Sequence, residues 1–182
     1  SDLRFILNGD LYGGSALGKV NTKTASIVRD NMNTVETTTI DIYSGTIIGN
    51  VFGGGLGEKD GIDGGTRNIA AIVHGKIQVN IGKDNGDGSY SGSAKLQNAT
   101  IYGCNNVNGT PENDVYIDVY RTYLRPTDSV GITEDATFAI GNVYGGGNRA
   151  DYAPTNIYRG NLATIDANRR SEERRVGKEC RS

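Results

Sequence analysis

The residues best suited to chemistry lie in one loop that is rich in hard oxygen donors. Asp84, Asn85, Asp87 and Ser89 stand close together among glycines, and carboxylate, amide and hydroxyl oxygens are the ligands that Ca²⁺ prefers. Their spacing departs from an EF-hand loop, which requires a closing glutamate. A polar turn is therefore the favoured interpretation, with Asp84 and Asp87 as weak calcium candidates. No cofactor and no catalytic residue is predicted.

A second candidate is a glycine-rich stretch that fits the opening of a phosphate-binding loop. Residues 13–19 read Gly-Gly-Ser-Ala-Leu-Gly-Lys and follow an expected strand. The next residue, Val20, has no hydroxyl for Mg²⁺, and no amphipathic helix follows to offer its N-terminus to a phosphate. We therefore interpret these residues as turn glycines and expect no nucleotide site.

The chain has one histidine, His74. A histidine-rich zinc site needs more, and a Ser/His/Asp triad needs a serine in a nucleophile elbow, which the sequence lacks. We expect His74 to be a structural or solvent-facing residue.

Two carboxylates and three tyrosines stand at outward positions of alternating strand patterns. Asp41 and Asp118 are candidates for acid/base work on a polysaccharide, but solvated carboxylates explain them equally well. Tyr43, Tyr116 and Tyr120 fit either a carbohydrate-stacking platform or caps on the flanks of the fold. The residues leave these alternatives open.

The elements that position these residues come from an internal repeat. Four octets align on an aliphatic residue, an aromatic residue and a glycine: NGDLYGGS at 8–15, IGNVFGGG at 48–55, NATIYGCN at 98–105 and IGNVYGGG at 140–147. Their aromatic residues are separated by 40, 50 and 42 positions. In a strand, the aliphatic and aromatic side chains point to opposite faces, so one of them faces the core. The following glycines permit sharp turns and close backbone approach.

Further strands are expected at residues 39–43, 76–81, 115–120 and 155–158, where β-branched and polar residues alternate. No segment before residue 170 has the pattern of a capped amphipathic helix. These features predict an all-β fold, a β-solenoid of stacked 40 to 50 residue repeats in which each repeat supplies about two rungs. A kelch-like propeller is the alternative, and the absence of tryptophan argues against it.

The last thirteen residues differ from the rest in charge density. RSEERRVGKECRS at 170–182 resembles the translation of a widely used short-read sequencing adapter, so we treat it as a non-native tail.

Residues 1–169 are expected to form one repeat-built domain, a fragment open at both ends. They hold 14 basic and 18 acidic residues, a net charge of −4. This balance predicts no binding to nucleic acid, no apolar run is long enough to span a membrane, and Cys104 has no disulfide partner.

Two segments carry a family resemblance. GTIIGNVFGGGLG at 45–57 and FAIGNVYGGGNRA at 138–150 are similar to the repeats of large adhesin-like surface proteins of gut anaerobes. The third octet departs from this pattern at Cys104 and Asn105. The resemblance implies a bacterial cell-surface or secreted location, a role in attachment or surface coating, and no catalytic residues.

We therefore expect a non-enzymatic structural or adhesive module, with host or microbial glycans or surface proteins as its partners. The alternatives are a glycan-binding module and a polysaccharide-active enzyme on a parallel β-helix.

Overall fold

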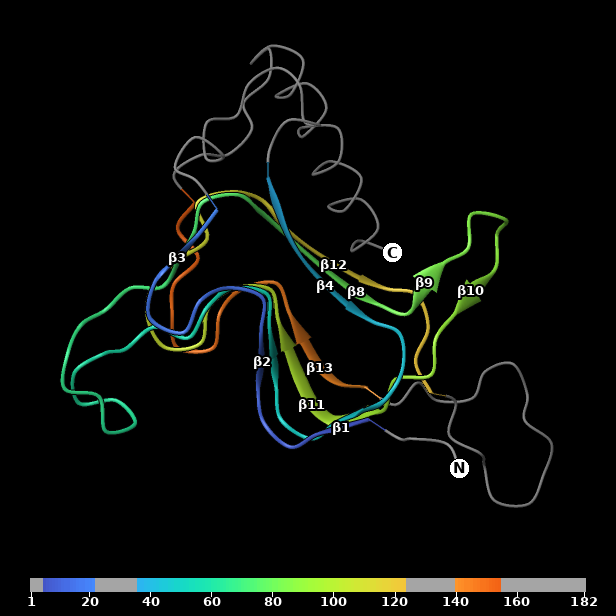
Figure 1. Ribbon diagram of the computed structural model, residues 1–182, viewed down its shortest axis with the longest axis horizontal. Helices are drawn as coiled ribbons and strands as arrows, with labels where there is room; N and C mark the ends of the chain where they lie inside the picture. The colour runs from blue at the N-terminus through green and yellow to red at the C-terminus, as the bar shows by residue number, and fades with distance from the viewer. Residues whose placement is uncertain (1–4, 22–35, 124–139, 155–182) are drawn as a thin grey trace, which may run out of the picture.

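The computed structural model describes residues 5–21, 36–123 and 140–154, and all regular structure in these ranges is β-strand (Figure 1). The all-β expectation is confirmed. The strands are β1 (Ile6–Leu7), β2 (Leu11–Tyr12), β3 (Lys19–Val20), β4 (Thr37–Ile42), β5 (Thr46–Ile47), β6 (Val51–Phe52), β7 (Ile72–Val73), β8 (Lys76–Ile81), β9 (Lys83–Asp84), β10 (Tyr90–Ser91), β11 (Leu96–Tyr102), β12 (Val115–Val119) and β13 (Ile140–Tyr144). Nowhere in the described ranges is there a helix of the length and hydropathy that a membrane crossing requires.

The strands pair mostly in parallel, in several small sheets. The largest sheet has the order β13-β11-β6-β2, and a second has the order β12-β8-β4. The pairs β1-β5 and β3-β7 are also parallel, whereas the hairpin β9-β10 is antiparallel. Figure 1 shows β4, β8 and β12 side by side on one flank, β2, β11 and β13 on another, and the hairpin projecting away from both.

The four octets lie in consecutive strands of the largest sheet. Tyr12 pairs with Phe52, Phe52 with Tyr102, and Tyr102 with Tyr144, each in direct register. Their rings form a continuous stack, with centroids 5.0, 4.9 and 5.4 Å apart. We call these four residues the aromatic ladder. The repeat alignment made from the sequence is therefore confirmed at the aliphatic and aromatic positions of all four octets, while a register shift between Leu96 and Thr100 displaces the start of the third.

Neighbouring strands of the largest sheet are one whole repeat apart, which corrects the expectation of two rungs per repeat. We call the strands contributed by one repeat a layer. Val51 pairs with Leu11 and with Ile101, so one step across the sheet takes a whole repeat. Each repeat is spread over several short strands at different positions around the fold, and loops take up the remaining residues. The parallel pairing also departs from the kelch-like alternative, because propeller blades are antiparallel sheets. The predicted strand at 155–158 lies outside the described residues.

The hydrophobic core lies between the two larger sheets. Ile77, Val79 and Ile81 of β8 are fully buried, and they belong to one cluster with Val51 and Ile101 of the octets. The aliphatic members of the first three octets thus face the core, as expected, whereas Val143 of the fourth is 43% exposed. The aromatic members lie outside this cluster and bury themselves by stacking, so that Phe52, between two neighbours, is only 1% exposed.

The glycine that follows the aromatic residue allows successive repeats to approach closely at Gly13, Gly53 and Gly103. The N–H of Gly53 donates to the carbonyl oxygen of Tyr102 at 2.8 Å, and that of Gly13 donates to Phe52 at 2.9 Å. A Cβ on Gly53 would meet the carbonyl oxygen of Gly103 and would lie 2.6 Å from Ile77 of the facing sheet. A larger residue therefore cannot occupy this position without displacing the next layer or the core.

Cys104 follows the glycine of the third octet and is fully buried. Its thiol donates to the carbonyl oxygen of Gly145 at 3.3 Å, and burial raises the pKa of the thiol to about 12. At neutral pH the side chain is therefore a protonated, packed group, as the sequence suggests for a lone thiol.

The aromatic ladder predicts a position-dependent cost of truncation. Phe52→Ala is expected to lower the free energy of unfolding by about 3–5 kcal/mol, because it removes a buried ring and leaves a cavity. Tyr144→Ala, at a ladder position that is 50% exposed, should cost less than about 1 kcal/mol. Urea denaturation followed by circular dichroism measures both, and equal losses would contradict the stacked arrangement.

The octet glycines provide a matched pair of substitutions. Gly53→Ala is expected to destabilise the fold by about 1–3 kcal/mol, because the new methyl group overpacks the space between layers. Gly145→Ala occupies the same octet position, but its Cβ would meet nothing within 4 Å, so the change should stay within about 0.5 kcal/mol. Thermal denaturation of the two variants distinguishes a steric requirement from a general preference for glycine.

Candidate functional site

The outward side chains of β4, β8 and β12 form rows of polar residues across the sheet. Because residues two apart share a face of a strand, the inward isoleucines and valines place the alternate residues, such as Asp41 and Asn80, on the opposite face. The register aligns Asp41 with Asn80 and Asn80 with Asp118. We call this surface the polar face. Asp41 and Asp118 therefore do share a face, with an asparagine between them.

Amide groups tie the two carboxylates into a hydrogen-bonded row. Asn80 donates from Nδ2 to Oδ1 of Asp41 at 2.7 Å. Gln78 donates from Nε2 to Oδ2 of Asp118 and to Oδ1 of Asn80, both at 2.7 Å. The amides thus separate the two negative charges and hold each carboxylate in place.

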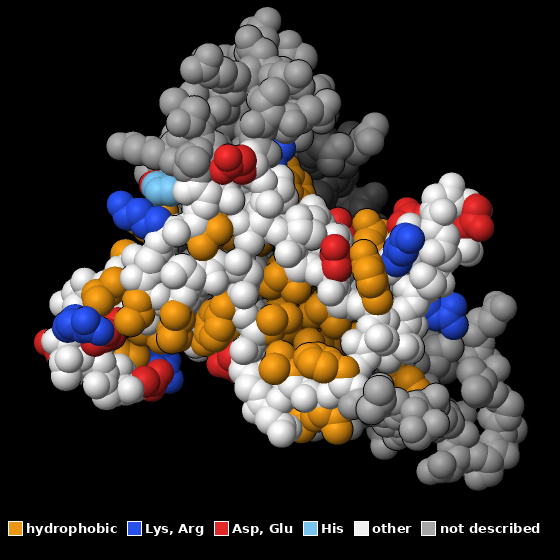
Figure 2. All heavy atoms as spheres, viewed as in Figure 1, with side chains coloured by type: hydrophobic (Ala, Val, Ile, Leu, Met, Phe, Trp, Pro, Cys, Tyr) orange, Lys and Arg blue, Asp and Glu red, His pale blue; other side chains and the backbone are white. Residues whose placement is uncertain are grey.

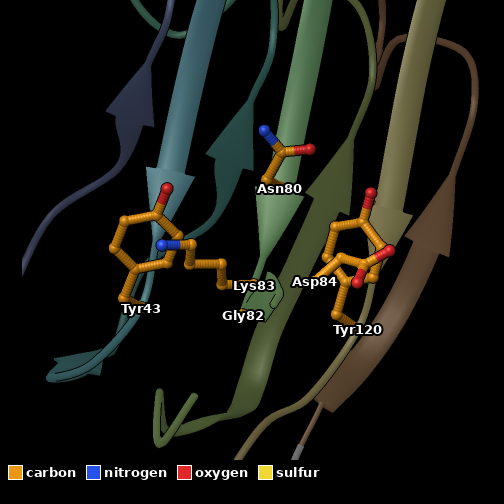
Figure 3. Close-up of a pocket in the computed structure, with 6 residues that line it drawn as sticks. All are labelled: Tyr43, Asn80, Gly82, Lys83, Asp84 and Tyr120. Carbon is orange, nitrogen blue, oxygen red and sulfur yellow. The ribbon is translucent and has the colours of Figure 1, made fainter. Parts of the chain in front are cut away.

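The next row of the polar face borders a small, open pocket. Tyr43 follows β4 and Tyr120 follows β12, while Gly82 occupies the middle position of the row after β8. We call this cavity the tyrosine pocket (Figure 3), and its volume is about 180 Å³. Its lining residues are Tyr43, Asn80, Gly82, Lys83, Asp84 and Tyr120.

Gly82 is required at this point by its backbone and its surroundings. Its φ is +76°, a conformation that side chains disfavour. A Cβ would also meet the backbone of Arg121 and, at 2.8 Å, the carbonyl oxygen of Ser91. The chain turns out of β8 here into the hairpin β9-β10, which brings Lys83 and Asp84 to the wall of the pocket.

The second tyrosine of the pocket is held by its neighbours. Tyr120 stacks on Tyr90 of the hairpin, with ring centroids 5.8 Å apart. Burial raises the pKa of Tyr120, and the negative charges of Asp118 and Asp84 raise it further. The phenol therefore stays protonated at neutral pH and can donate a hydrogen bond.

The two calcium candidates lie at different places in the hairpin. Asp84 lines the tyrosine pocket, and its Oδ1 accepts from the N–H of Gly86 at 2.8 Å. Asp87 lies in the loop, where its Oδ1 accepts from the N–H of Ser89 at 2.9 Å and from the Ser89 hydroxyl at 2.6 Å. These bonds lower the pKa of Asp87, the hydroxyl having the larger effect.

Both carboxylates thus support turns of the loop, as in Asx-turns. In the described part of the chain, no group of three or more His, Cys, Asp or Glu side chains is arranged to hold a metal ion. Calcium binding by Asp84 and Asp87 stays a prediction.

The other candidates lie away from the pocket. His74 is 6% exposed and its Nδ1 lies 2.8 Å from Oε2 of Glu112. Residues 13–19 run from the turn after β2 into β3, and the N–H groups of Gly13 and Gly14 donate to Phe52 and Gly54 of the next layer. Those N–H groups are therefore engaged within the fold, in keeping with turn glycines.

A second cavity, of about 370 Å³, is lined by residues of β1, β2, β4, β5 and the turn between β4 and β5. Its lining is mainly apolar and includes Phe5, Leu7, Leu11, Ile42 and Ile47. Figure 2 shows hydrophobic side chains gathered in a hollow between the two flanks. The cavity borders the core, to which Ile42 and Ile47 belong.

Sequence reasoning did not identify Asn80, Gly82 and Lys83. The signal for Gly82 was present, since a glycine directly after a regular six-residue strand and before a loop marks a change of direction. Asn80 became notable only when strand register placed it between the two aspartates.

Comparison with known proteins does not extend these findings: no protein-family model, curated protein or solved structure matches this chain.

The amide row predicts a pH-dependent variant. Asn80→Asp places a third carboxylate beside Asp41 and removes the donor between them, so it should lower the free energy of unfolding at pH 7 by about 1–3 kcal/mol. The repulsion favours protonation in the folded state. The loss should therefore be full at neutral pH, shrink as the pH falls through the raised pKa of the carboxyl pair, and be smallest below about 4, where the unfolded chain is also protonated.

Urea denaturation at pH 7 and at a pH below about 4 measures the change in the free energy of unfolding. Asn80→Ala is the control, because it removes the hydrogen bonds without adding a charge, and its cost should change much less with pH. An Asn80→Asp variant that matched Asn80→Ala at both pH values would contradict the close approach of Asp41.

Proposed function

We propose that this chain is a β-solenoid with one repeat per coil, and that it acts as a non-enzymatic structural and adhesive module of a bacterial cell-surface or secreted protein. The observation that carries the proposal is the direct register of the four octets in one parallel sheet. Such a register extends by adding repeats, which suits a long surface structure.

The order of strands within each repeat supports the solenoid. The same order of strands occurs twice, as β1-β2-β3-β4 and as β5-β6-β7-β8. In each case a short strand precedes the octet strand, and another short strand and then a six-residue strand follow it. The third repeat continues the pattern with β11 and β12, and isolated parallel bridges at Lys95 and Pro111 take the places of its short strands. Insertions such as the hairpin β9-β10 project outward without interrupting the stack (Figure 1).

The polar face and the resemblance of the octets to adhesin-like repeats support the adhesive role. The face presents a flat, hydrogen-bonded surface with exposed tyrosines, Tyr43 at 47% and Tyr116 at 41%. Amphipathic rings of this kind are common where one macromolecule binds another.

A polysaccharide-active enzyme is the second candidate, favoured by the shared row of Asp41 and Asp118. Two strand spacings separate their backbones by about 9.6 Å, close to the upper end of the carboxylate separation in inverting glycosidases, about 6.5–9.5 Å. Against it, each carboxylate is engaged by a neighbouring amide group.

Binding without cleavage is the outcome that the structural and adhesive role predicts. The chain is incubated with neutral and acidic polysaccharides and examined by affinity gel electrophoresis, while mass spectrometry monitors soluble products. We expect retarded migration on at least one polysaccharide and no new products. Products that disappear in Asp118→Asn would establish the enzyme instead, and a chain retarded by no polysaccharide or surface protein would count against adhesion.

A further inference from the structure

The tyrosine pocket brings together two aromatic rings, an amide and two opposite charges. From the geometry and chemistry of its lining we infer that it is a binding subsite for one neutral pyranose residue of a polysaccharide. This inference deepens the proposed adhesive role and rests on it, since it names the ligand class and the residues that contact it.

The size of the pocket is set by the glycine in its row. Tyr43 and Tyr120 stand two strand spacings apart, about 9.6 Å, and Gly82 between them has no side chain to fill the interval. The resulting cavity of about 180 Å³ is smaller than the ~300–1,000 Å³ of pockets for drug-sized ligands. It therefore suits a single small ring rather than a long segment of chain.

The lining matches the two kinds of surface on a sugar ring. A pyranose has C–H groups that pack on aromatic rings and hydroxyls that both donate and accept hydrogen bonds. Tyr43 and Tyr120 offer aromatic rings with hydroxyls, Asn80 an amide, Lys83 three donors and Asp84 an acceptor. Figure 3 shows these groups drawn from three neighbouring strands and the root of the hairpin, around one opening.

The balance of charge favours a neutral ligand over an acidic one. Lys83 brings one positive charge to the pocket and Asp84 brings one negative charge. Two further carboxylates lie close by, since Asp41 bonds to Asn80 and the charge of Asp118 acts on Tyr120. The negative charges near the pocket would therefore repel a uronate or a phosphate.

The lining groups are held in place before any ligand arrives. Asn80 is oriented by Asp41 and Gln78, and Tyr120 is fixed by its stack on Tyr90. Asp84 is tied to the N–H of Gly86. Groups that are already ordered lose less conformational entropy on binding, which strengthens a site of this small size.

The test uses the full 182-residue chain, labelled with ¹⁵N, and follows its backbone amides during titration. The probes are the methyl glycosides of glucose, mannose and galactose, with sodium glucuronate as the acidic comparison. We expect at least one neutral glycoside to shift the amides of Gly82, Lys83 and Asp84, and glucuronate to bind at least about tenfold more weakly.

Variants locate the site. Tyr43→Ala and Tyr120→Ala should each weaken binding of that glycoside by about tenfold or more. Tyr116→Ala is the matched control, because Tyr116 of β12 lies on the same face as Tyr120, which directly follows that strand, but does not line the pocket. Its affinity should stay within about twofold of the parent. Tyr43 is 47% exposed, so Tyr43→Ala should keep the fold, which circular dichroism checks.

Three results would overturn the inference: no neutral glycoside moving these amides, an equal loss in Tyr116→Ala, or tighter binding of glucuronate. Each leaves the adhesive role standing if the chain still binds a polysaccharide or a surface protein. Release of products from a polysaccharide incubated with the chain would instead overturn the proposed function, so the two failures are distinguishable.

Discussion

The close approach of successive layers at the octet glycines is the constraint on which the rest of this fold depends. Where the aromatic residue is followed by glycine, the glycine N–H donates a hydrogen bond to a carbonyl oxygen of the next layer. Because glycine has no Cβ, there is room beside it for another carbonyl oxygen of that layer. This contact supports the register, and a shift by one residue would also turn the inward aliphatic residues away from the core. The same register aligns the rings of the aromatic ladder and the inward aliphatic residues.

A fixed register on one flank also organises the opposite flank. Gly53 lies against Ile77 and Val79 of β8, and Gly13 lies against Ile40 of β4. The long strands are thereby aligned layer by layer, and their outward residues form continuous rows. The hydrogen-bonded row of Asp41, Asn80 and Asp118 and the pocket beside it are consequences of packing that occurs on the other side of the sheet.

Insertions are tolerated because each layer contacts mainly its neighbours. The hairpin β9-β10 leaves the sheet at Gly82, where a positive φ and a crowded backbone exclude other residues. The layers above and below continue undisturbed, while the hairpin supplies Lys83, Asp84 and Tyr90 to the polar face. In this way the scaffold gains a pocket without loss of its core.

The sequence by itself determined the all-β class, the octet alignment and the strand at Lys76–Ile81, because alternation and glycine spacing are local and periodic signals. It also placed Asp41 and Asp118 on outward positions. Only the tertiary structure decided that one repeat spans one layer and that Asn80 separates the aspartates. It also decided that Gly82 opens a gap between two tyrosines. These facts depend on which strands become neighbours, and alternation within a single strand does not determine its neighbours.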